Sequence, residues 1–369
     1  MKIAVVGTRG IPNILGGIET HCEELFPRIV SKGFDITVFR RKEYVKDCLS
    51  DYKGTRLVTL QSPKKKAFEA IIHTVKAIVY ARYKLHADVV HIHAVGPALA
   101  TPLARLLGLK VVFTHHGPDY ERDKWGKIAR RILRLGERLG VRYANEIIVI
   151  SRVINNLIQQ KYNRTNAHII YNGVSKPVFY TDVKYLNKLK IEPKKYLFAM
   201  GRFVQEKNFH QLIQAFVSLN ENKGYRLVIA GDADFQDEYA QKLKQLAKEN
   251  DIVLTGFLKG PQLQTLWSNA GGFVLPSSHE GLPISLLEAM SYRLPVIVSN
   301  IPANMEVELS PDCYFQVNDV ETLKEKLQQF IHTGNQQHYY SMDKYQWDRI
   351  AEQTADIYQR LAYNNHLEQ

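Results

Sequence analysis

Residues 272–290 read GFVLPSSHEGLPISLLEAM. The apolar run Gly272–Leu275 is typical of a short strand, and Pro283 marks a helix start because proline fits the first helical turn. Glu280 lies in the loop between them, whereas Glu288 lies in the helix among apolar neighbours. Strand, polar loop and helix in this order form the repeating unit of a parallel α/β sheet. The stretch therefore predicts an α/β protein.

The same alternation continues from this unit in both directions. Amphipathic helical stretches such as Thr20–Lys32, Gln211–Leu219 and Gln236–Asn250 separate short apolar, β-branched runs. Because those runs are continuously apolar, we expect strands buried on both faces of parallel sheets. The pattern predicts two doubly wound, Rossmann-like domains with a cleft between them, and ligands of such sheets bind at the carboxyl ends of the strands. The predicted strands are Lys2–Gly7, Asp35–Arg40, Val89–Ile92, Lys110–Thr114, Glu146–Ile150, Lys195–Gly201, Tyr225–Gly231, Asp251–Thr255, Gly272–Leu275 and Pro295–Ser299.

The chain has 369 residues, about twice the usual length of one domain. We predict an N-terminal domain over residues 1–180 and a C-terminal domain over residues 181–340. The linker between them is expected within Lys176–Lys195, where the apolar periodicity lapses. Apolar spacing over Gln336–Ala362 predicts a helix, and residues 341–369 are assigned to a separate C-terminal helical segment.

Composition and segment lengths exclude several classes of protein. Hydrophobic residues make up 45% of the chain and charged residues 23%, which is typical of a globular protein rather than a disordered or fibrous one. No apolar stretch approaches the roughly 18–20 residues of a membrane-spanning helix, and Ile3–Val6 is too short for a secretion signal. Cys22, Cys48 and Cys313 are too widely spaced to predict a disulfide framework or a zinc site. We therefore expect a soluble cytoplasmic protein.

The net charge of +12 is distributed unevenly. Residues 1–190 hold 33 of the 49 Lys and Arg residues but only 15 of the 37 Asp and Glu residues. The N-terminal half is therefore strongly basic, and the rest of the chain is mildly acidic. A basic surface favours anionic partners such as phospholipid headgroups, polyphosphates or nucleic acid.

A glycine-rich loop, Gly7–Thr20, follows the first predicted strand and leads into a helix. Glycines there, Gly16 and Gly17 among them, let backbone amides approach an anion at the helix N-terminus. The spacing matches neither the dinucleotide-binding fingerprint nor a Walker loop, which disfavours the usual modes of dinucleotide or ATP binding. A tight turn that only packs the helix on the sheet explains the loop equally well.

Two further loops contain residue types that can bind metals, but their sequence context is weak evidence for a metal site. His115 and His116 end the strand Lys110–Thr114, but no third ligand follows at a spacing typical of metal sites. His116 is expected to donate a hydrogen bond in the cleft, and His115 to be buried in the strand end. The Asp232-Ala233-Asp234 run lies in a generic strand-to-helix loop, so we do not expect a metal there.

The loop that follows the strand Lys195–Gly201 contains Arg202 and Lys207. A guanidinium that grips phosphate at two oxygens, beside a mobile ammonium, forms a diphosphate site that needs no metal. The carboxylates of Glu280 and Glu288 would accept hydrogen bonds from sugar hydroxyls on either side of the helix start at Pro283. Solvated surface charge is the alternative interpretation of both pairs.

These motifs together resemble the glycosyltransferases of the GT-B fold, family 4, which use nucleotide-sugar donors and retain the anomeric configuration. The resemblance spans nearly the whole chain and is most specific at Glu280 and Glu288, within PSSHEGLP and LEAM. The sequences GTRGIP and HHGPDYERDKWG are similar to a subgroup from bacterial polysaccharide clusters that includes rhamnosyltransferases using dTDP-rhamnose.

The resemblance implies roles for individual residues. Arg202 and Lys207 would neutralise the donor diphosphate, Glu280 would hold the transferred sugar, and His116 would approach that sugar from the first domain. Glu288 would bind the ribose, and the Gly256–Leu258 segment would pack near the base. The C-terminal helix would pack back on the N-terminal domain. The implied donor-binding residues are Gly16, Gly17, Glu288, Gly256, Phe257, Leu258, Gly281, Leu282, Pro283 and Ile284.

The implied partners are a UDP-, dTDP- or GDP-sugar donor and a glycan or lipid-linked acceptor, without a metal or another cofactor. A basic amphipathic helix near residues 124–142 would dock on an anionic membrane surface at the inner face of the plasma membrane, with Lys64–Lys66 extending that surface. A solvated helix face is the alternative. The helix combines seven cations with apolar points: Lys124, Lys127, Arg130, Arg131, Arg134, Arg138, Arg142, and Trp125, Ile128, Ile132, Leu135, Leu139.

Two other classes remain open at the level of sequence. A nucleotide-sugar epimerase of GT-B shape would share the architecture, but we do not expect it to combine the two glutamates with Arg202 and Lys207. A nucleic-acid-binding protein is compatible with the charge, but the chain shows no helix-turn-helix, zinc or aromatic RNA-binding signature. We therefore predict no nucleic-acid partner.

Overall fold

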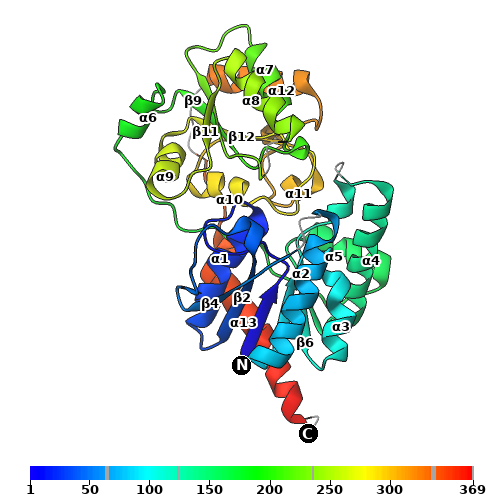
Figure 1. The fold of residues 1–369 in the computed structure, drawn as a ribbon. Coiled ribbons are helices and arrows are strands. Elements are labelled where there is room, and N and C mark those ends of the chain that lie inside the picture. Colours follow the sequence, from blue (N-terminus) through cyan, green and yellow to red (C-terminus); the bar gives the residue numbers. More distant parts are fainter. Residues whose placement is uncertain (63–65, 123–124, 235–236, 334–337, 368–369) are drawn as a thin grey trace. The chain divides into compact units, whose positions relative to one another are not determined.

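The computed structural model describes residues 1–62, 66–122, 125–234, 237–333 and 338–367 (Figure 1). The chain forms two compact units. Unit 1 comprises Met1–Gly173 together with Lys344–Gln369, and unit 2 comprises Val174–Asp343. Each unit has its own predominantly parallel sheet covered by helices, so the two Rossmann-like domains expected from the sequence alternation are confirmed.

The sheet of unit 1 has the strand order β3-β4-β2-β1-β5-β6-β7-β8 and is parallel except for the pair β3 and β4. The strands are β1 (Lys2–Val6), β2 (Asp35–Arg41), β3 (Asp51–Tyr52), β4 (Thr55–Leu60), β5 (Val89–His93), β6 (Lys110–His115), β7 (Glu146–Val149) and β8 (His168–Ile169). The main helices are α1 (Gly17–Val30), α2 (Lys66–Tyr80), α3 (Thr101–Leu106), α4 (Lys127–Tyr143), α5 (Arg152–Tyr162) and α13 (Trp347–Leu367).

The sheet of unit 2 is parallel throughout, in the order β11-β10-β9-β12-β13-β14. Its strands are β9 (Tyr196–Met200), β10 (Arg226–Ala230), β11 (Val253–Gly256), β12 (Gly272–Leu275), β13 (Val296–Ser299) and β14 (Tyr314–Phe315). Its helices are α6 (Lys184–Lys188), α7 (Phe209–Val217), α8 (Glu238–Glu249), α9 (Gly260–Asn269), α10 (Ile284–Ser291), α11 (Pro302–Met305) and α12 (Val320–Thr333). The short helix α6 lies within the segment that the sequence analysis treated as linker.

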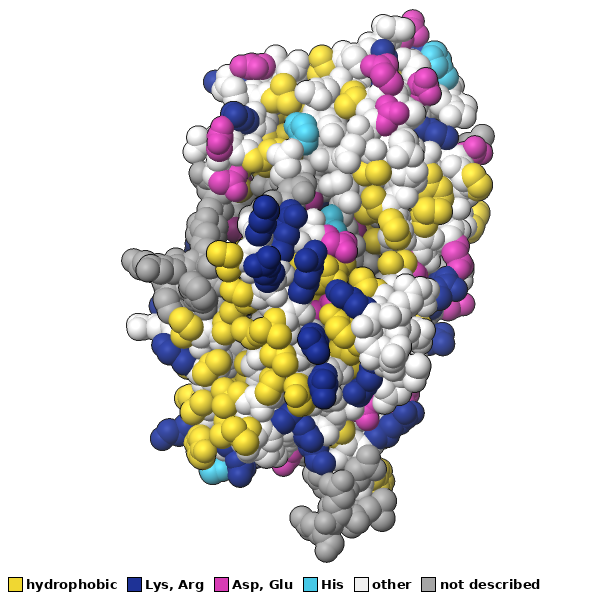
Figure 2. Space-filling model, turned by 90° about the vertical axis from the view of Figure 1, so that its right-hand side faces the viewer, with side chains coloured by type: hydrophobic (Ala, Val, Ile, Leu, Met, Phe, Trp, Pro, Cys, Tyr) yellow, Lys and Arg dark blue, Asp and Glu magenta, His cyan; other side chains and the backbone are white. Residues whose placement is uncertain are grey.

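Helix α4 approaches its neighbours in unit 1 most closely at two glycines. A Cβ on Gly136 would collide with the Val95 carbonyl oxygen, and one on Gly140 would collide with Ala98 and Phe113. On the outer side of the helix, Ile128 is 75% exposed and Leu135 is 47% exposed. Figure 2 shows Lys and Arg side chains gathered beside hydrophobic ones on this face of unit 1. We call the exposed residues Lys127, Ile128, Arg131, Arg134, Leu135, Arg138 and Arg142 the α4 surface.

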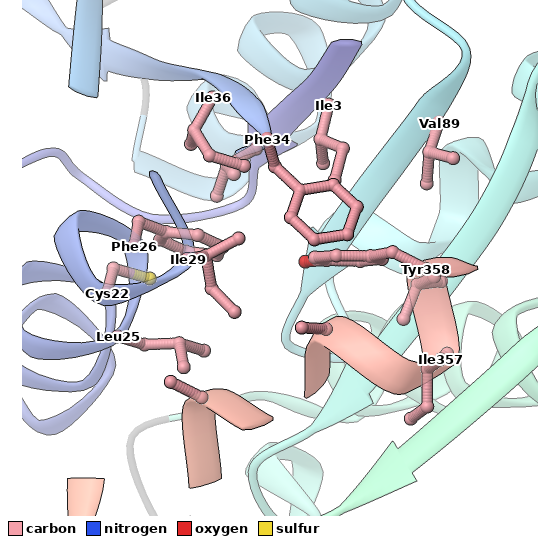
Figure 3. Packing of buried hydrophobic residues seen from close by; sticks show 14 of the residues in the cluster. Ile3, Cys22, Leu25, Phe26, Ile29, Phe34, Ile36, Val89, Ile357 and Tyr358 are labelled. Carbon is pink, nitrogen blue, oxygen red and sulfur yellow. The ribbon is translucent and has the colours of Figure 1, made fainter. Parts of the chain in front are cut away.

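Helix α13 completes the core of unit 1 although it comes from the far end of the chain. It packs against α1, and its Tyr358 ring lies beside Phe34 in the same hydrophobic cluster (Figure 3). The Tyr358 hydroxyl is 2.6 Å from Nδ1 of His91. The helix begins at Trp347, so the prediction of helix from Gln336 was wrong for residues 338–342, while Asp343–Tyr345 form one turn of 3-10 helix. Tyr340 is half-buried and Tyr345 is buried, so their spacing resembles that of a helix face. The chain nevertheless passes from unit 2 to unit 1 between Asp343 and Lys344.

Within the described part of the chain, none of the helices has both the length and the apolar character needed to cross a bilayer.

Candidate functional site

The strand order of unit 2 reverses between β9 and β12, which are neighbours in the sheet. Strands β10 and β11 continue on one side of this pair, and β13 and β14 on the other. Loops that leave two such strands diverge, and ligands of open α/β sheets bind in the crevice at this point. Residues 201–208 and 276–283 form those two loops. The two strongest sequence motifs therefore lie at the same edge of the sheet.

Two of the predicted residues meet in an ion pair. Nζ of Lys207 is 2.5 Å from Oε1 of Glu280, and the two side chains are only 15% and 12% exposed. Arg202, from the same loop as Lys207, places Nη1 3.1 Å from Oδ2 of Asp234. Limited exposure strengthens such pairs, since bulk water screens them less.

Backbone contacts fix the two loops against each other. The amide N–H of Ser278 donates to the Glu206 carbonyl oxygen at 2.9 Å, and the Asn208 side-chain amide donates to the Pro276 carbonyl oxygen at 3.1 Å. Asn208 has φ 51°, a left-handed conformation that asparagine tolerates better than most residues. Sequence analysis missed the roles of Asn208 and Ser278. The only sequence signal for these contacts was an asparagine directly after a polar turn, at position 208.

The Asp232-Ala233-Asp234 run forms the third loop at this edge. Nζ of Lys244 is 2.7 Å from Oδ1 of Asp232, and Asp234 pairs with Arg202, so a side-chain cation accompanies each carboxylate. A Cβ on Gly231 would collide with the Gly201 carbonyl oxygen, so the loops after β9 and β10 are in close contact. The sequence analysis considered Asp234 only as a metal ligand and missed it as the partner of Arg202.

The other predicted donor-binding residues of unit 2 lie in two places. Leu282 and Ile284 are buried at the start of α10, so only backbone groups there are available to a ligand, whereas Glu288 remains partly exposed one turn further on. Gly281 and Pro283 belong to the same helix start. The Gly256–Leu258 segment begins at the last residue of β11, which lies three strands from β12, and its Phe257 side chain is 41% exposed. The structure thus places this segment at the same sheet edge but not beside Glu280.

In unit 1, the glycine-rich loop is held by two carboxylates of α1. Oε1 of Glu19 accepts a hydrogen bond from the Arg9 amide and Oε2 of Glu23 accepts one from the Asn13 amide, each at 3.0 Å. Gly16, with φ 149°, ends the loop, and a Cβ at this position would collide with the Glu19 carboxylate. Gly17 begins α1 and has open space where a side chain would be. The sequence analysis missed Glu19 and Glu23 as residues that shape the loop.

His116 belongs to a group of three imidazoles that we call the imidazole cluster: His21 on α1, His93 at the end of β5, and His116 after β6. Nδ1 of His93 is 2.9 Å from Nε2 of His116, and one ring nitrogen from each residue lies within 4.8 Å of the others. Burial lowers the pKa of His21 to about 4, although a hydrogen bond with Asn172 opposes the shift, and burial also lowers the pKa values of His93 and His116 well below their usual range. The three rings are therefore neutral at pH 7. The sequence spacing around His115 and His116 could not predict this cluster, because the two histidines that the fold brings to His116 lie 23 and 95 positions away.

His115 points into a different polar group. Its Nε2 is 2.9 Å from Oε1 of Glu137, a fully buried carboxylate on α4. The same carboxylate accepts hydrogen bonds from the hydroxyls of Tyr120 (3.0 Å) and Tyr162 (2.5 Å) and from Nζ of Lys161 (2.6 Å). Sequence analysis expected His115 to be buried but missed Glu137, which the helical pattern presents as one polar residue among many.

Comparison with known proteins identifies both halves of the chain. Residues 15–176 match the family model described as Glycosyltransferase Family 4, and residues 184–347 match the model described as Glycosyl transferases group 1. The chain belongs to the GT-B glycosyltransferases.

Curated relatives and solved structures support this assignment. The chain is 24% identical to an uncharacterized glycosyltransferase of Methanocaldococcus jannaschii, over 97% of this chain and 98% of the relative. It is 28% identical to the O-antigen chain mannosyltransferase RfbU of Salmonella typhimurium, over 55% of each. Sucrose-phosphate synthase from Thermosynechococcus elongatus has a TM-score of 0.82 at 19% identity, covering 98% of this chain and 99% of that one. HepE of Anabaena, in complex with UDP-glucose, has a TM-score of 0.74 at 16% identity and 99% coverage of both chains.

Proposed function

We propose that this glycosyltransferase transfers a sugar, with retention, from a nucleoside-diphosphate donor to a glycan or lipid-linked acceptor in bacterial surface polysaccharide synthesis. The observation that carries the proposal is the Lys207–Glu280 contact beside Arg202, at the switch point of the unit 2 sheet. The RfbU relative supports a polysaccharide context, and the HepE complex supports a nucleotide-sugar donor. The motifs shared with rhamnosyltransferases make dTDP-rhamnose one donor to test.

The ion pair suggests how the donor would engage the site. The Glu280 carboxylate lies 2.5 Å from the Lys207 ammonium and balances its charge. A diphosphate carries more negative charge than one carboxylate and would draw Lys207 toward its oxygens, as it would draw Arg202 from Asp234. Glu280 would then be available to accept hydrogen bonds from the hydroxyls of the transferred sugar. The two exchanges would couple diphosphate binding to sugar binding.

The chemical step places negative charge on the departing diphosphate. Fixed cations aimed at that charge stabilise the transition state more than the ground state. We favour substitution on one face of the sugar, in which the leaving phosphate oxygen accepts the proton of the acceptor hydroxyl. A covalent glycosyl-enzyme formed through a carboxylate is the alternative route to retention. His116, Gly16 and Gly17 in unit 1, and Glu288 and the Gly256–Leu258 segment in unit 2, remain proposed donor contacts.

A thermal-shift screen tests the donor. UDP-, dTDP- and GDP-sugars are added to the chain in the presence of EDTA, and at least one is expected to raise the unfolding temperature. A ligand at 100 times its Kd stabilises the native state by about 2.7 kcal/mol. Lys207→Ala should lose most of this shift, whereas Lys242→Ala, on an exposed pair of α8, should keep it. A shift that requires added Mg²⁺, or one that survives in Lys207→Ala, argues against metal-free diphosphate binding by Lys207.

The same screen addresses the epimerase alternative. An epimerase would convert the stabilising nucleotide sugar without any acceptor, whereas a transferase leaves it intact until an acceptor is added. The matched family models describe glycosyltransferases and give the epimerase interpretation no support.

We further propose that the α4 surface meets an anionic membrane that carries the acceptor. It combines exposed arginines with the exposed apolar residues Ile128 and Leu135, a pattern suited to phospholipid headgroups. A cavity of about 600 Å³ lies at its end. Lys64, Lys65 and Lys124, which the sequence analysis added to this surface, lie outside the described residues. The cavity is lined by Arg138, Val141, Arg142, Lys161, Tyr162, Asn163 and Arg164.

A liposome flotation assay tests the membrane proposal. The wild-type chain is expected to float with vesicles rich in phosphatidylglycerol and to remain behind with phosphatidylcholine, since about 1 kcal/mol is gained per basic residue near an anionic surface. Arg131→Glu with Arg138→Glu should abolish flotation. The control variant Lys242→Glu with Lys248→Glu, on α8 of unit 2, changes the net charge by the same amount and should float like the wild-type chain. Equal, negligible binding to both vesicle types would remove the proposal.

A further inference from the structure

The imidazole cluster is more elaborate than one hydrogen-bond donor to a sugar requires. Three elements distant in sequence, α1, β5 and the loop after β6, each contribute one histidine. His21 and His93 are buried, and Nε2 of His93 has no hydrogen-bond partner among the described residues. A buried polar atom without a partner is costly, and it is usually retained where it serves a ligand or a function.

The chemistry of the cluster fits a transition-metal ion. Neutral imidazole nitrogen is the preferred ligand of Zn²⁺ and of related ions such as Cu²⁺ and Ni²⁺. In a tetrahedral zinc site with Zn–N bonds of 2.0–2.1 Å, the ligand nitrogens lie about 3.3 Å apart. One ring nitrogen of each residue lies within 4.8 Å of the others, and Nδ1 of His93 and Nε2 of His116 are 2.9 Å apart. Side-chain movements of about 1.5 Å or less would therefore bring all three to ligand distance.

A second contact orients one of the three rings. Nδ1 of His21 is 3.0 Å from the side-chain oxygen of Asn172. An oxygen partner keeps the proton on Nδ1, which leaves the Nε2 lone pair of His21 free to bind a metal. Metal-binding histidines in proteins commonly have such a partner on the nitrogen that does not face the ion. His21 also lies edge-on to Trp347, with ring centroids 5.5 Å apart, which restricts its rotation.

We propose that His21, His93 and His116 bind one Zn²⁺-type ion through three imidazole nitrogens, with a fourth position open to water or an anionic group. This site lies within unit 1 and is separate from the Asp232-Ala233-Asp234 loop of unit 2. Its consequence for catalysis rests on the proposed function: an ion bound to His116 withdraws that side chain from the sugar. Zn²⁺ would then inhibit transfer rather than support it.

The test measures metal binding directly and does not depend on sugar transfer. The full chain is stripped with EDTA and titrated with Zn²⁺ by calorimetry, and with Co²⁺ by visible absorption, where tetrahedral nitrogen coordination gives a strong d–d band. We expect one equivalent to bind, and His21→Gln and His93→Gln each to weaken binding at least 100-fold. His210→Gln, which alters a partly buried histidine of unit 2, is the matched control and should bind like wild type. Circular dichroism establishes that each variant is folded.

Asn172 variants separate a metal site from a merely structural cluster. Asn172→Asp creates a carboxylate partner for His21 and should tighten Zn²⁺ binding, while Asn172→Ala should weaken it, each by about tenfold or more. A purely structural role for Asn172 predicts no change in metal affinity from either substitution. No binding by the wild-type chain at micromolar Zn²⁺, or undiminished binding by His93→Gln, overturns the proposal. Either result leaves the donor screen and the proposed function unaffected.

Discussion

Replacing Lys207 with alanine is expected to lower kcat/KM for sugar transfer about 100-fold or more. This loss corresponds to about 2.7 kcal/mol of transition-state stabilisation, the scale for removing one preorganised charged contact. The ammonium is held at the end of β9 by the fixed loop 201–208 and is only 15% exposed, so water does not replace it well. Steady-state rates at saturating acceptor, with donor concentration varied, measure the effect. Arg202→Ala should show a loss of similar size.

Part of the loss could come from Glu280 rather than from the diphosphate. Lys207→Ala also removes the ammonium that pairs with the Glu280 carboxylate, which would itself disturb the site. The double variant Lys207→Ala, Glu280→Gln removes the carboxylate charge as well, and it should remain at least as impaired as Lys207→Ala if the ammonium acts on the donor. Lys242→Ala, whose exposed ion pair with Glu238 lies on α8, should transfer sugar normally. Near-normal transfer by Lys207→Ala or Arg202→Ala contradicts the assigned roles.

The framework around this site could be predicted because its physical signals are local. Strands β1 and β9 are buried on both faces, and a continuous apolar run is what such burial requires. Strands that are not buried on both faces, or that are very short, were not predicted. Strand β4, Thr55–Leu60, carries exposed and half-buried residues, and β3, β8 and β14 have only two residues each. The partly exposed residues of β4 and the shortness of the other three strands leave no apolar run long enough to detect.

In the candidate site, too, some features could be predicted from the sequence and others could not. Glycines, prolines and charged residues after a strand mark a loop at the carboxyl edge of the sheet, which is why Arg202, Lys207 and Glu280 could be named from sequence. Which cation faces which carboxylate depends on tertiary packing: Lys207 and Glu280 are 73 positions apart. The imidazole cluster and the partners of Glu137 likewise join residues that no periodic pattern relates.

The buried carboxylate of Glu137 gives the prediction with the largest effect on stability. Glu137→Gln preserves the size of the side chain but removes the charge that His115, Lys161 and two tyrosine hydroxyls converge on. Breaking a buried charged network typically costs about 3–5 kcal/mol. For a unit of this size, about 3 kcal/mol corresponds to a drop in Tm of roughly 6 °C or more, measurable by calorimetry. Glu146→Gln, which disrupts the partly exposed Glu146–His168 pair, is the control and should cost about 1 kcal/mol or less.

The loss from Glu137→Gln should also depend on pH in a defined direction. Burial alone would raise the pKa of Glu137, but hydrogen bonds from His115, Lys161 and Tyr162 outweigh it and lower the pKa to about 2, against 4.5 for an ordinary glutamate. A carboxylate whose pKa is lowered by folding stabilises the native state above its unfolded value and loses that contribution as the pH falls toward its folded value. The difference in unfolding free energy between wild type and Glu137→Gln should therefore be full above about pH 5 and shrink steadily between pH 4.5 and 2. Urea unfolding of both chains from pH 7 to pH 3 measures this difference. A gap that stays constant or widens on acidification would show that the ionised Glu137 carboxylate does not hold this network together.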